Sequence, residues 1–252
     1  MPFTISHAAI VLPFTYSFRK YFSATGLIIG SMVPDFFYFV FLNPYFSDGH
    51  TWWGIFVYDI PLALLLAFLY HQLVKPVLIS YLPTWAGNRL QLFRPFNWNR
   101  YFRKHYLITI FSMLLGVLTH FFLDGFTHEG GWFVCQIPAL QQNITVFQHP
   151  MPMWYLMQYL TSLVGLLILF YFFMKIPMTS NHRPIEKRQK IRFWLITALL
   201  SAVILWANEY FHHIDTKRLD YLATALGGIF YGLVITAAWY RNKNPHSKTD
   251  TI

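Results

Sequence analysis

The sequence is short of charged residues and of cysteine. Only 12% of its 252 residues are Asp, Glu, Lys or Arg, whereas soluble domains carry about 25%. Too few polar groups are therefore present to cover a surface that faces water. The single cysteine, Cys135, excludes an internal disulfide and any metal site built from several cysteines.

Several catalytic signatures are also absent. The sequence contains no GxSxG, Walker loop, dinucleotide-binding glycine motif or HExxH. Serine-nucleophile chemistry, nucleotide binding and zincin-type proteolysis therefore have no support. The opening residues, "MPFTISHAAIVLPF", lack a basic start and contain a proline within the apolar run, so they do not predict a cleavable signal peptide.

Apolar residues make up 56% of the chain, and aromatic residues alone make up 20%. A membrane span needs roughly 20 mostly apolar residues. Five clear candidates are 55–74, 106–124, 154–174, 193–211 and 221–240, and a sixth, 24–42, is interrupted at Pro34 and Asp35. We therefore predict an all-α, polytopic transmembrane helix bundle of about six spans, with residues 1–252 forming a single integral membrane domain.

The net charge of +9 is a topology signal, because the basic residues cluster between spans. Residues 75–105 carry six Lys or Arg and no acid, and residues 175–192 carry six against Glu186. Lysine and arginine accumulate on the cytoplasmic side of membranes. We predict that both loops and the C-terminus are cytoplasmic. Membrane lipids are then the expected partners, and nucleic acid is not.

The opposite side collects acids and histidines, most densely in "HFFLDGFTH", residues 120–128. On a helix, His120 and Asp124 point the same way, about 6 Å apart along the axis, and can bind one metal ion between them. His128 continues the row, or returns on a turn if Gly125 ends the helix. Imidazole and carboxylate ligands suit zinc or a similar divalent ion. The alternative is a polar helix end at the membrane surface, without metal.

Two carboxylates lie within apolar runs. Burying a lone carboxylate in a span costs roughly 2.5–3.5 kcal/mol on insertion scales, so such residues are functional candidates. Asp35, in "GSMVPDFFYFV", is one, and Asp59, in "IFVYDIPLALLLAF", is the other. Alternatively, Asp35 caps a helix that restarts after Pro34, and Asp59 lies among the lipid headgroups.

Two further groups of histidines are candidate ligands. His50, in "SDGHTWWG", lies in a predicted outer loop and is either a ligand or a surface residue. Glu209, His212 and His213 form ExxHH at the end of a predicted span, where exposed histidines are also common.

Five blocks of the sequence resemble a bacterial family of integral membrane proteins known as a domain of unknown function, number 4184. The blocks are "MPFTISHAAIVLPF", "GLIIGSMVPDFFYF", "HTWWGIFVYDIPLALLLAF", "LLGVLTHFFLDGFTHEGG" and "MWYLMQYLTSLVGLL". They occur in order over residues 1–170, which form the family-like core. Residues 171–252 add two spans and a basic tail. This resemblance implies a multi-pass protein of the bacterial cytoplasmic (inner) membrane.

The order of the polar residues is also similar to that of membrane-bound metal-dependent hydrolases and zinc-dependent phospholipases C. Their ligands run as His, Asp, His, HxxxD and His. The resemblance implies ligands at His7, Asp35, His50, His120, Asp124 and His128, holding zinc or another divalent ion. The phospholipases end with a further HxxxE pair that this chain lacks, which favours one or two ions over three.

The position of His7 leaves three alternatives open. If residues 24–42 cross the membrane from inside, His7 starts on the cytoplasmic side, away from the other ligands. Either the first segment re-enters from outside, or the break at Asp35 lets the N-terminus reach the site, or His7 is not a ligand.

Two functions follow from this pattern. The first is a membrane-embedded metal-dependent hydrolase of a phosphoester or phospholipid headgroup, with its site at the outer face. Asp35 would act as ligand or general base, and Asp59, the second residue predicted to serve catalysis, would orient a ligand from behind. The second is a transporter or scaffold whose buried Asp and His serve proton coupling or helix pairing.

Overall fold

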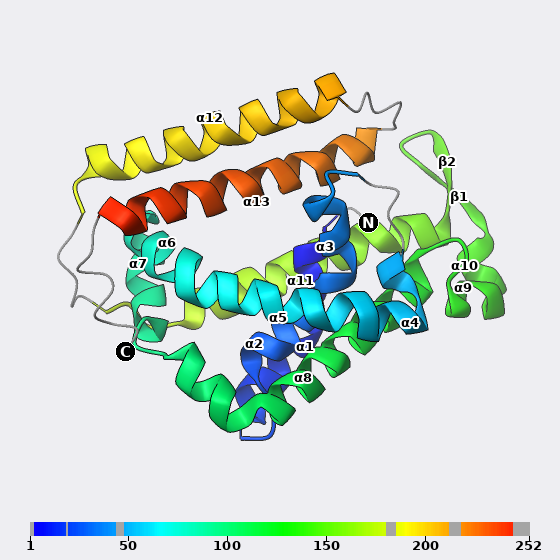
Figure 1. The fold of residues 1–252 in the computed structure, drawn as a ribbon. Helices are drawn as coiled ribbons and strands as arrows, with labels where there is room; N and C mark the ends of the chain where they lie inside the picture. Colours follow the sequence, from blue (N-terminus) through cyan, green and yellow to red (C-terminus); the bar gives the residue numbers. More distant parts are fainter. Residues whose placement is uncertain (1–2, 19, 44–47, 180–184, 212–217, 244–252) are drawn as a thin grey trace. The chain divides into compact units, whose positions relative to one another are not determined.

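The computed structural model describes residues 3–18, 20–43, 48–179, 185–211 and 218–243, and these residues are nearly all helical (Figure 1). Helices and strands follow one another as η1 (Thr4–His7), α1 (Ala8–Ser17), α2 (Ala24–Gly30), α3 (Val33–Val40), η2 (Asp48–His50), α4 (Trp52–Gly54), η3 (Ile55–Asp59), α5 (Ile60–Leu69), η4 (Tyr70–Val74), α6 (Lys75–Tyr81), α7 (Thr84–Leu90), η5 (Gln91–Phe93), α8 (Trp98–Thr127), α9 (Trp132–Gln136), α10 (Pro138–Gln141), β1 (Asn143–Val146), β2 (His149–Pro152), α11 (Met153–Lys175), α12 (Lys187–Phe211) and α13 (Arg218–Lys243).

The chain folds into two compact units, each assembled from separated stretches. Unit 1 contains the described residues of 1–35, 47–63 and 107–172, and unit 2 contains those of 36–46, 64–106 and 173–252. All six residues predicted as ligands belong to unit 1. The prediction of one integral membrane domain over residues 1–252 stays a prediction.

Four helical segments of the described chain are long and apolar enough to cross a membrane. They are Trp52–Tyr81, Trp98–Gln136, Met153–Lys175 and Lys187–Phe211. These segments contain four of the predicted spans, and they support a membrane protein. The predicted span 221–240 lies within the helix α13, which is not among the four. The predicted count of about six spans is therefore not confirmed.

Residues 24–42 do not form one continuous helix. Ser23 caps α2 by accepting a hydrogen bond from the backbone N–H of Gly26 at 3.2 Å, and α2 ends at Gly30. Pro34 cannot donate to a carbonyl one turn earlier and its ring clashes there, so the chain starts a new helix, α3. At about 1.5 Å per residue, neither helix approaches the roughly 30 Å of a bilayer core.

Within unit 1, α2 packs closely on α8 through glycine. A side chain on Gly116 of α8 would place its Cβ 2.6 Å from the carbonyl oxygen of Leu27, closer than real Cβ atoms come. The backbone N–H of Ser23 also donates to Ser112 Oγ of α8 at 2.8 Å. The C-terminal end of α2 is thereby held against the part of α8 that carries His120.

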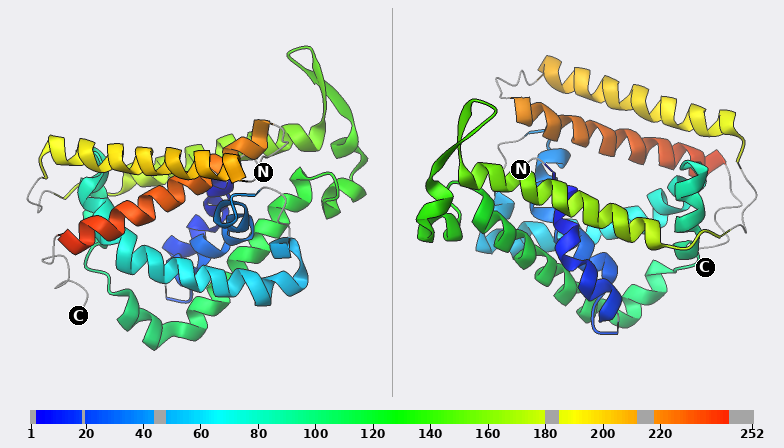
Figure 2. Two further views of the ribbon diagram at one scale, coloured as in Figure 1. Left: turned by 45° about the horizontal axis from the view of Figure 1, so that its top comes forward. Right: turned by 180° about the vertical axis from the view of Figure 1, so that it is seen from behind.

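The N-terminal segment packs on α11 in the same way. A Cβ on Gly165 would lie 2.8 Å from the carbonyl oxygen of Ser6, which precedes His7. The right-hand view of Figure 2 shows α1 beside α11. This contact fixes where the first histidine of the chain points.

A short β-hairpin, which the sequence did not predict, joins α10 to α11. Its strands β1 and β2 pair antiparallel, with Val146 opposite His149. The two loop residues, Phe147 and Gln148, have φ values of 47° and 66°. A tight two-residue hairpin turn requires positive φ, usually supplied by Asn-Gly, so its usual sequence signal is missing here.

Unit 2 is built on the helix pair α12 and α13, which lie side by side (Figure 1). Its buried cluster contains Val77, Tyr81, Phe193 and Ala237. The rings of Tyr81 and Phe193 stack with their centroids 4.7 Å apart. This cluster belongs to unit 2 alone and contains no candidate ligand.

The close approach of α2 and α8 predicts a specific sensitivity at Gly116. Gly116→Leu should lower the unfolding free energy by about 1–3 kcal/mol, the usual cost of overpacking, because the backbone of α2 blocks the new side chain. Thermal unfolding in detergent measures this. Gly130→Ala is the matched control, since a Cβ there meets nothing within 4 Å. Equal stability of the two variants would contradict the packing described.

Candidate metal centre

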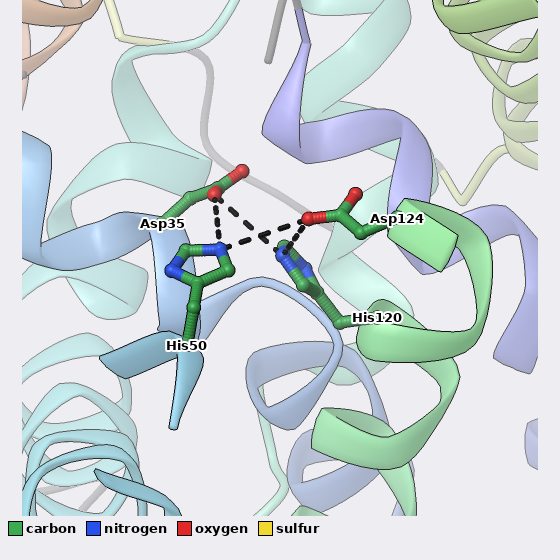
Figure 3. A group of neighbouring side chains, drawn as sticks. All are labelled: Asp35, His50, His120 and Asp124. Atoms are coloured by element: carbon green, nitrogen blue, oxygen red, sulfur yellow. Dashed lines mark ion pairs between the residues drawn. The ribbon is translucent and has the colours of Figure 1, made fainter. Parts of the chain in front are cut away.

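Four acidic and histidine side chains of unit 1 converge on one point (Figure 3). Asp35 lies in the first turn of α3, and His50 ends η2. His120 and Asp124 lie one turn apart on α8. One ligand atom from each residue lies within 4.8 Å of all the others, so the group can hold a metal ion.

Each histidine of this group faces both carboxylates. The distances are 3.4 Å from His50 Nε2 to Asp35 Oδ1, 3.6 Å from His50 Nε2 to Asp124 Oδ2, 3.6 Å from His120 Nε2 to Asp35 Oδ1 and 3.2 Å from His120 Nε2 to Asp124 Oδ2. The side chains of His120 and Asp35 are fully buried, whereas that of His50 is 24% exposed. The cluster is therefore reached from the side of His50.

The backbone of α2 sets the tautomer of His120. His120 Nδ1 lies 2.9 Å from the carbonyl oxygen of Ser31, the residue that follows α2. A carbonyl only accepts, so Nδ1 carries the hydrogen and Nε2 turns its lone pair toward the carboxylates. Among the described residues, His120 Nε2 and Asp35 Oδ1, which lie 3.6 Å apart, are buried and have no hydrogen-bond partner. Converging lone pairs of this kind need a cation between them.

The second oxygen of Asp35 is oriented by the N-terminal segment. Thr4 Oγ1 donates a buried hydrogen bond of 2.8 Å to Asp35 Oδ2. This bond leaves Oδ1 directed at the two histidines. Hydrogen bonds behind a ligand fix its orientation and tune its basicity.

The charges of the cluster favour positive charge at its centre. Burial by itself lowers the pKa of His50, but the interactions with the carboxylates of Asp124 and Asp35 outweigh burial and raise this pKa to about 9. Two buried carboxylates thus attract a cation, whether a proton on His50 or a metal ion.

His7 and His128 lie on the other side of Asp124. Asp124 Oδ1 is 3.7 Å from His7 Nε2 and 3.6 Å from His128 Nδ1. The ring of His7 also stacks on that of His120 with the centroids 4.1 Å apart. All six residues implied by the resemblance are therefore close together. The segment 24–42 is broken, as the second alternative for His7 requires. The role of His7 as a ligand stays a prediction.

The hydrogen bonds of His128 distinguish it from the four central residues. The side-chain amide of Gln158 lies 3.3 Å from His128 Nε2, and His128 Nδ1 lies 3.3 Å from the carbonyl oxygen of Asp124. The amide donates to Nε2 and the carbonyl accepts from Nδ1, so neither ring nitrogen has a free lone pair for an ion beside Asp124 Oδ1. In this geometry His128 supports Asp124 rather than completing a ligand set.

Asp59 is fully buried and stands apart from the four-residue group. It ends η3, a π-helical turn, and neither of its carboxylate oxygens has a hydrogen-bond partner. It interacts electrostatically with His50, His120 and Asp35. Single π-helical turns are frequent at functional sites. Asp59 is thus a third buried carboxyl group, beside the two that belong to the cluster.

Sequence reasoning missed three contributors to this site. Thr4 orients Asp35, the carbonyl of Ser31 orients His120, and Gln158 binds His128. Each acts across a long stretch of chain, and local spacing gave no signal for any of them. Of the ExxHH motif, Glu209 lies on α12 and His212 and His213 lie outside the described residues.

The fold and the cluster together define a helical membrane protein that can hold a metal ion between buried acids and histidines. A family model described as a domain of unknown function (DUF4184) matches residues 1–241. The chain belongs to this family, which confirms that part of the sequence prediction. No curated protein and no solved structure matches it.

The hydrogen bond from Thr4 predicts an effect on metal affinity. Thr4→Val should weaken metal binding about 10–100-fold, the usual cost of losing support behind a ligand, because Asp35 Oδ2 loses the hydrogen bond from Thr4 that orients the carboxylate. Thr4→Ser keeps the hydroxyl and should bind nearly as the wild type does. Titration against a chelator of known affinity measures both. Thr15→Val, which removes a hydroxyl bonded within α1, should leave affinity unchanged.

Proposed function

We propose that the protein is a membrane-embedded, metal-dependent hydrolase of phosphoesters. The observation that carries the proposal is the convergence of Asp35 Oδ1, His120 Nε2 and Asp124 Oδ2 with His50 in a buried position. Among the described residues, Asp35 Oδ1 and His120 Nε2 have no hydrogen-bond partner. Neutral imidazole and carboxylate are ligands that zinc and similar ions bind in hydrolytic sites. The order of these residues, which resembles that of zinc-dependent phospholipases C, supports the same reading.

The separations in the cluster fit a tetrahedral ion. Bonds of about 2.1 Å to zinc place neighbouring ligand atoms about 3.4 Å apart in a tetrahedron. The four His-to-Asp distances run from 3.2 to 3.6 Å. These four separations suit zinc, and the remaining two pairs of ligand atoms lie within 4.8 Å. A second ion would lie at Asp124 Oδ1 with His7, and would require His128 to turn.

A bound ion would lower the pKa of a coordinated water and offset negative charge on the phosphoryl oxygens. Hydrolysis joins the water oxygen to phosphorus, breaks the bond to the alcohol oxygen and transfers one proton to that oxygen. In this proposal the carboxylate of Asp35 accepts the proton first, and Asp59 acts from beside the cluster. His50 and His128, whose side chains are 24% and 38% exposed, border the approach to the cluster.

The site belongs to a chain with four apolar helices, so its substrate is proposed to be a phospholipid headgroup in the outer leaflet. The protein would lie in the bacterial cytoplasmic membrane, with the loops 75–105 and 175–192 and the C-terminus cytoplasmic. This orientation rests on the distribution of basic residues. It leaves the acids and histidines on the outer side.

One observation favours the alternative, a non-catalytic transporter or scaffold. Four protein ligands fill a tetrahedral shell, and closed shells are typical of structural zinc sites. The two functions differ in whether an exogenous ligand can bind the ion. In Co²⁺-loaded protein, cyanide should shift the visible absorption bands if the ion has an open coordination position. Bands that do not respond to cyanide would favour the structural role.

The first experiment is elemental analysis of detergent-purified protein. About one zinc or similar ion per chain should remain in the wild type, and His120→Ala/Asp124→Ala should lose it together with hydrolysis of bis(p-nitrophenyl) phosphate. The matched control is Glu129→Ala/His149→Ala, which removes an exposed acid and an exposed histidine. The proposal fails if the first double variant keeps all metal-dependent activity of the wild type.

Asp59 predicts a trade-off between stability and activity. Asp59→Leu should raise the unfolding temperature of metal-free protein, because a buried carboxylate without hydrogen bonds costs about 1–3 kcal/mol or more. The same change should lower hydrolysis of bis(p-nitrophenyl) phosphate at least tenfold. Calorimetry in chelator and steady-state kinetics measure the two effects. A variant that is less stable and fully active would assign Asp59 a purely structural role.

A further inference from the structure

A groove in unit 1 runs beside the metal centre. Its volume is about 370 Å³, within the range of about 300–1,000 Å³ of sites that hold small ligands. Three elements form its walls: the N-terminal segment of η1 and α1, the end of α8, and one face of α11. The lining residues are Ser6, His7, Ala9, Ile10, Leu123, Thr127, Met157, Gln158, Leu160, Thr161, Ser162, Val164, Gly165 and Ile168.

The hydroxyl groups on these walls are already satisfied within their own segments. Ser6 Oγ donates to the carbonyl of Phe3 at 2.6 Å, and Thr127 Oγ1 donates to that of Leu123 at 3.2 Å. On α11, Thr161 Oγ1 and Ser162 Oγ donate to carbonyl oxygens of the preceding turn, each at 2.8 Å. A ligand therefore meets methyl and methylene groups along most of the groove.

The remaining polar side chains of the groove belong to the metal centre. His7 lines the groove and also lies 3.7 Å from Asp124 Oδ1 through its Nε2. Gln158 lines the groove and also contacts His128 at 3.3 Å. The groove thus joins an apolar channel to an end that can bind a charged group. This combination matches an amphiphile rather than a free phosphate or a fully polar ester.

The open side of the groove belongs to a candidate membrane span. Leu160, Val164 and Ile168 of α11 line the groove and are 44%, 52% and 37% exposed. They recur every four residues, so they form one stripe along the helix. From Gln158 to Ile168 this face extends about 15 Å at 1.5 Å per residue. A lipid chain can therefore enter sideways from the bilayer.

We propose that this groove binds an acyl chain of a membrane lipid whose phosphate reaches the metal centre. The inference deepens the proposed function, because it makes the substrate a lipid recognised by its chain as well as by its headgroup. Ile10, Val164 and Ile168 then contact the chain, while His7 and Gln158 mark the turn from chain to headgroup. The bulk at Ile168 limits the length of chain that the groove accepts.

Photo-crosslinking tests the occupant directly. The protein is reconstituted in phosphatidylcholine vesicles that contain phosphatidylglycerol with a diazirine in the acyl chain, and the adducts are mapped by mass spectrometry. Labelling of Ile10 in the groove is divided by labelling of Leu163, which is exposed on α11 but does not line the groove. This ratio separates groove binding from random contact with bilayer lipid.

Two variants narrow the groove from opposite walls. Ile168→Trp and Ala9→Leu should each lower the ratio at least threefold. Leu167→Trp is the matched control, because Leu167 is adjacent and exposed but does not line the groove, and it should leave the ratio unchanged. Equal labelling in all variants overturns the inference. Adducts replaced by crosslinks between two copies, or by a co-purified protein, also overturn it.

The outcome is independent of turnover, so failure of this inference is distinguishable from failure of the proposed function. Labelling is measured in metal-free protein as well as in metal-loaded protein. If the groove variants change neither labelling nor hydrolysis of bis(p-nitrophenyl) phosphate, the acyl site fails and the hydrolase stands. If groove labelling responds as expected but no metal binds, the hydrolase fails.

Discussion

A buried carboxylate must lie beside positive charge, and in this protein that requirement falls on Asp35 and Asp124. Among the described residues, Asp35 Oδ1 has no hydrogen-bond donor, and His120 turns a lone pair toward both carboxylates. The arrangement is unfavourable without a cation, since unpaired polar atoms in a low dielectric cost several kcal/mol. Several features of unit 1 hold this cluster in place. A new helix that carries Asp35 starts at the break near Pro34, and Gly116 lets α2 approach α8. Gly165 leaves room for the N-terminal segment that carries Thr4 and His7.

The same residues connect the two halves of the proposed chemistry. Asp124 turns one oxygen to the four-residue group and the other toward His7 and His128. His7 in turn belongs to the wall of the apolar groove. An ion and an acyl chain would therefore be separated by little more than one imidazole ring. Chain binding and headgroup position would be linked through that ring, which is stacked on His120.

Local sequence patterns predicted the helical fold and the residues of the candidate metal site. They could not predict the hydrogen bonds that orient these residues. Helical spacing pairs His120 with Asp124, and apolar length locates four segments that can cross a membrane, because both depend on neighbouring residues. The segment 24–42 was counted among the predicted spans because its composition suits a bilayer. In the structure it forms two short helices, the second of which contains Pro34 in its first turn. Thr4, Ser31 and Gln158 act over separations of 30 to 89 residues, which only the tertiary fold reveals.

The partner of His120 Nδ1 is a main-chain carbonyl at the end of α2, where the helix leaves its last carbonyls unused. Every amino acid supplies that group, so the bond itself does not depend on the side chain of Ser31, although this side chain is fully buried and must stay small. The bond depends instead on Gly116, because the absence of a side chain there lets the end of α2, with the Ser31 carbonyl, lie close to α8. A mutational scan of unit 1 would therefore record this ligand's orientation as a requirement for glycine on another helix, and position 31 itself would show only a limit on side-chain size.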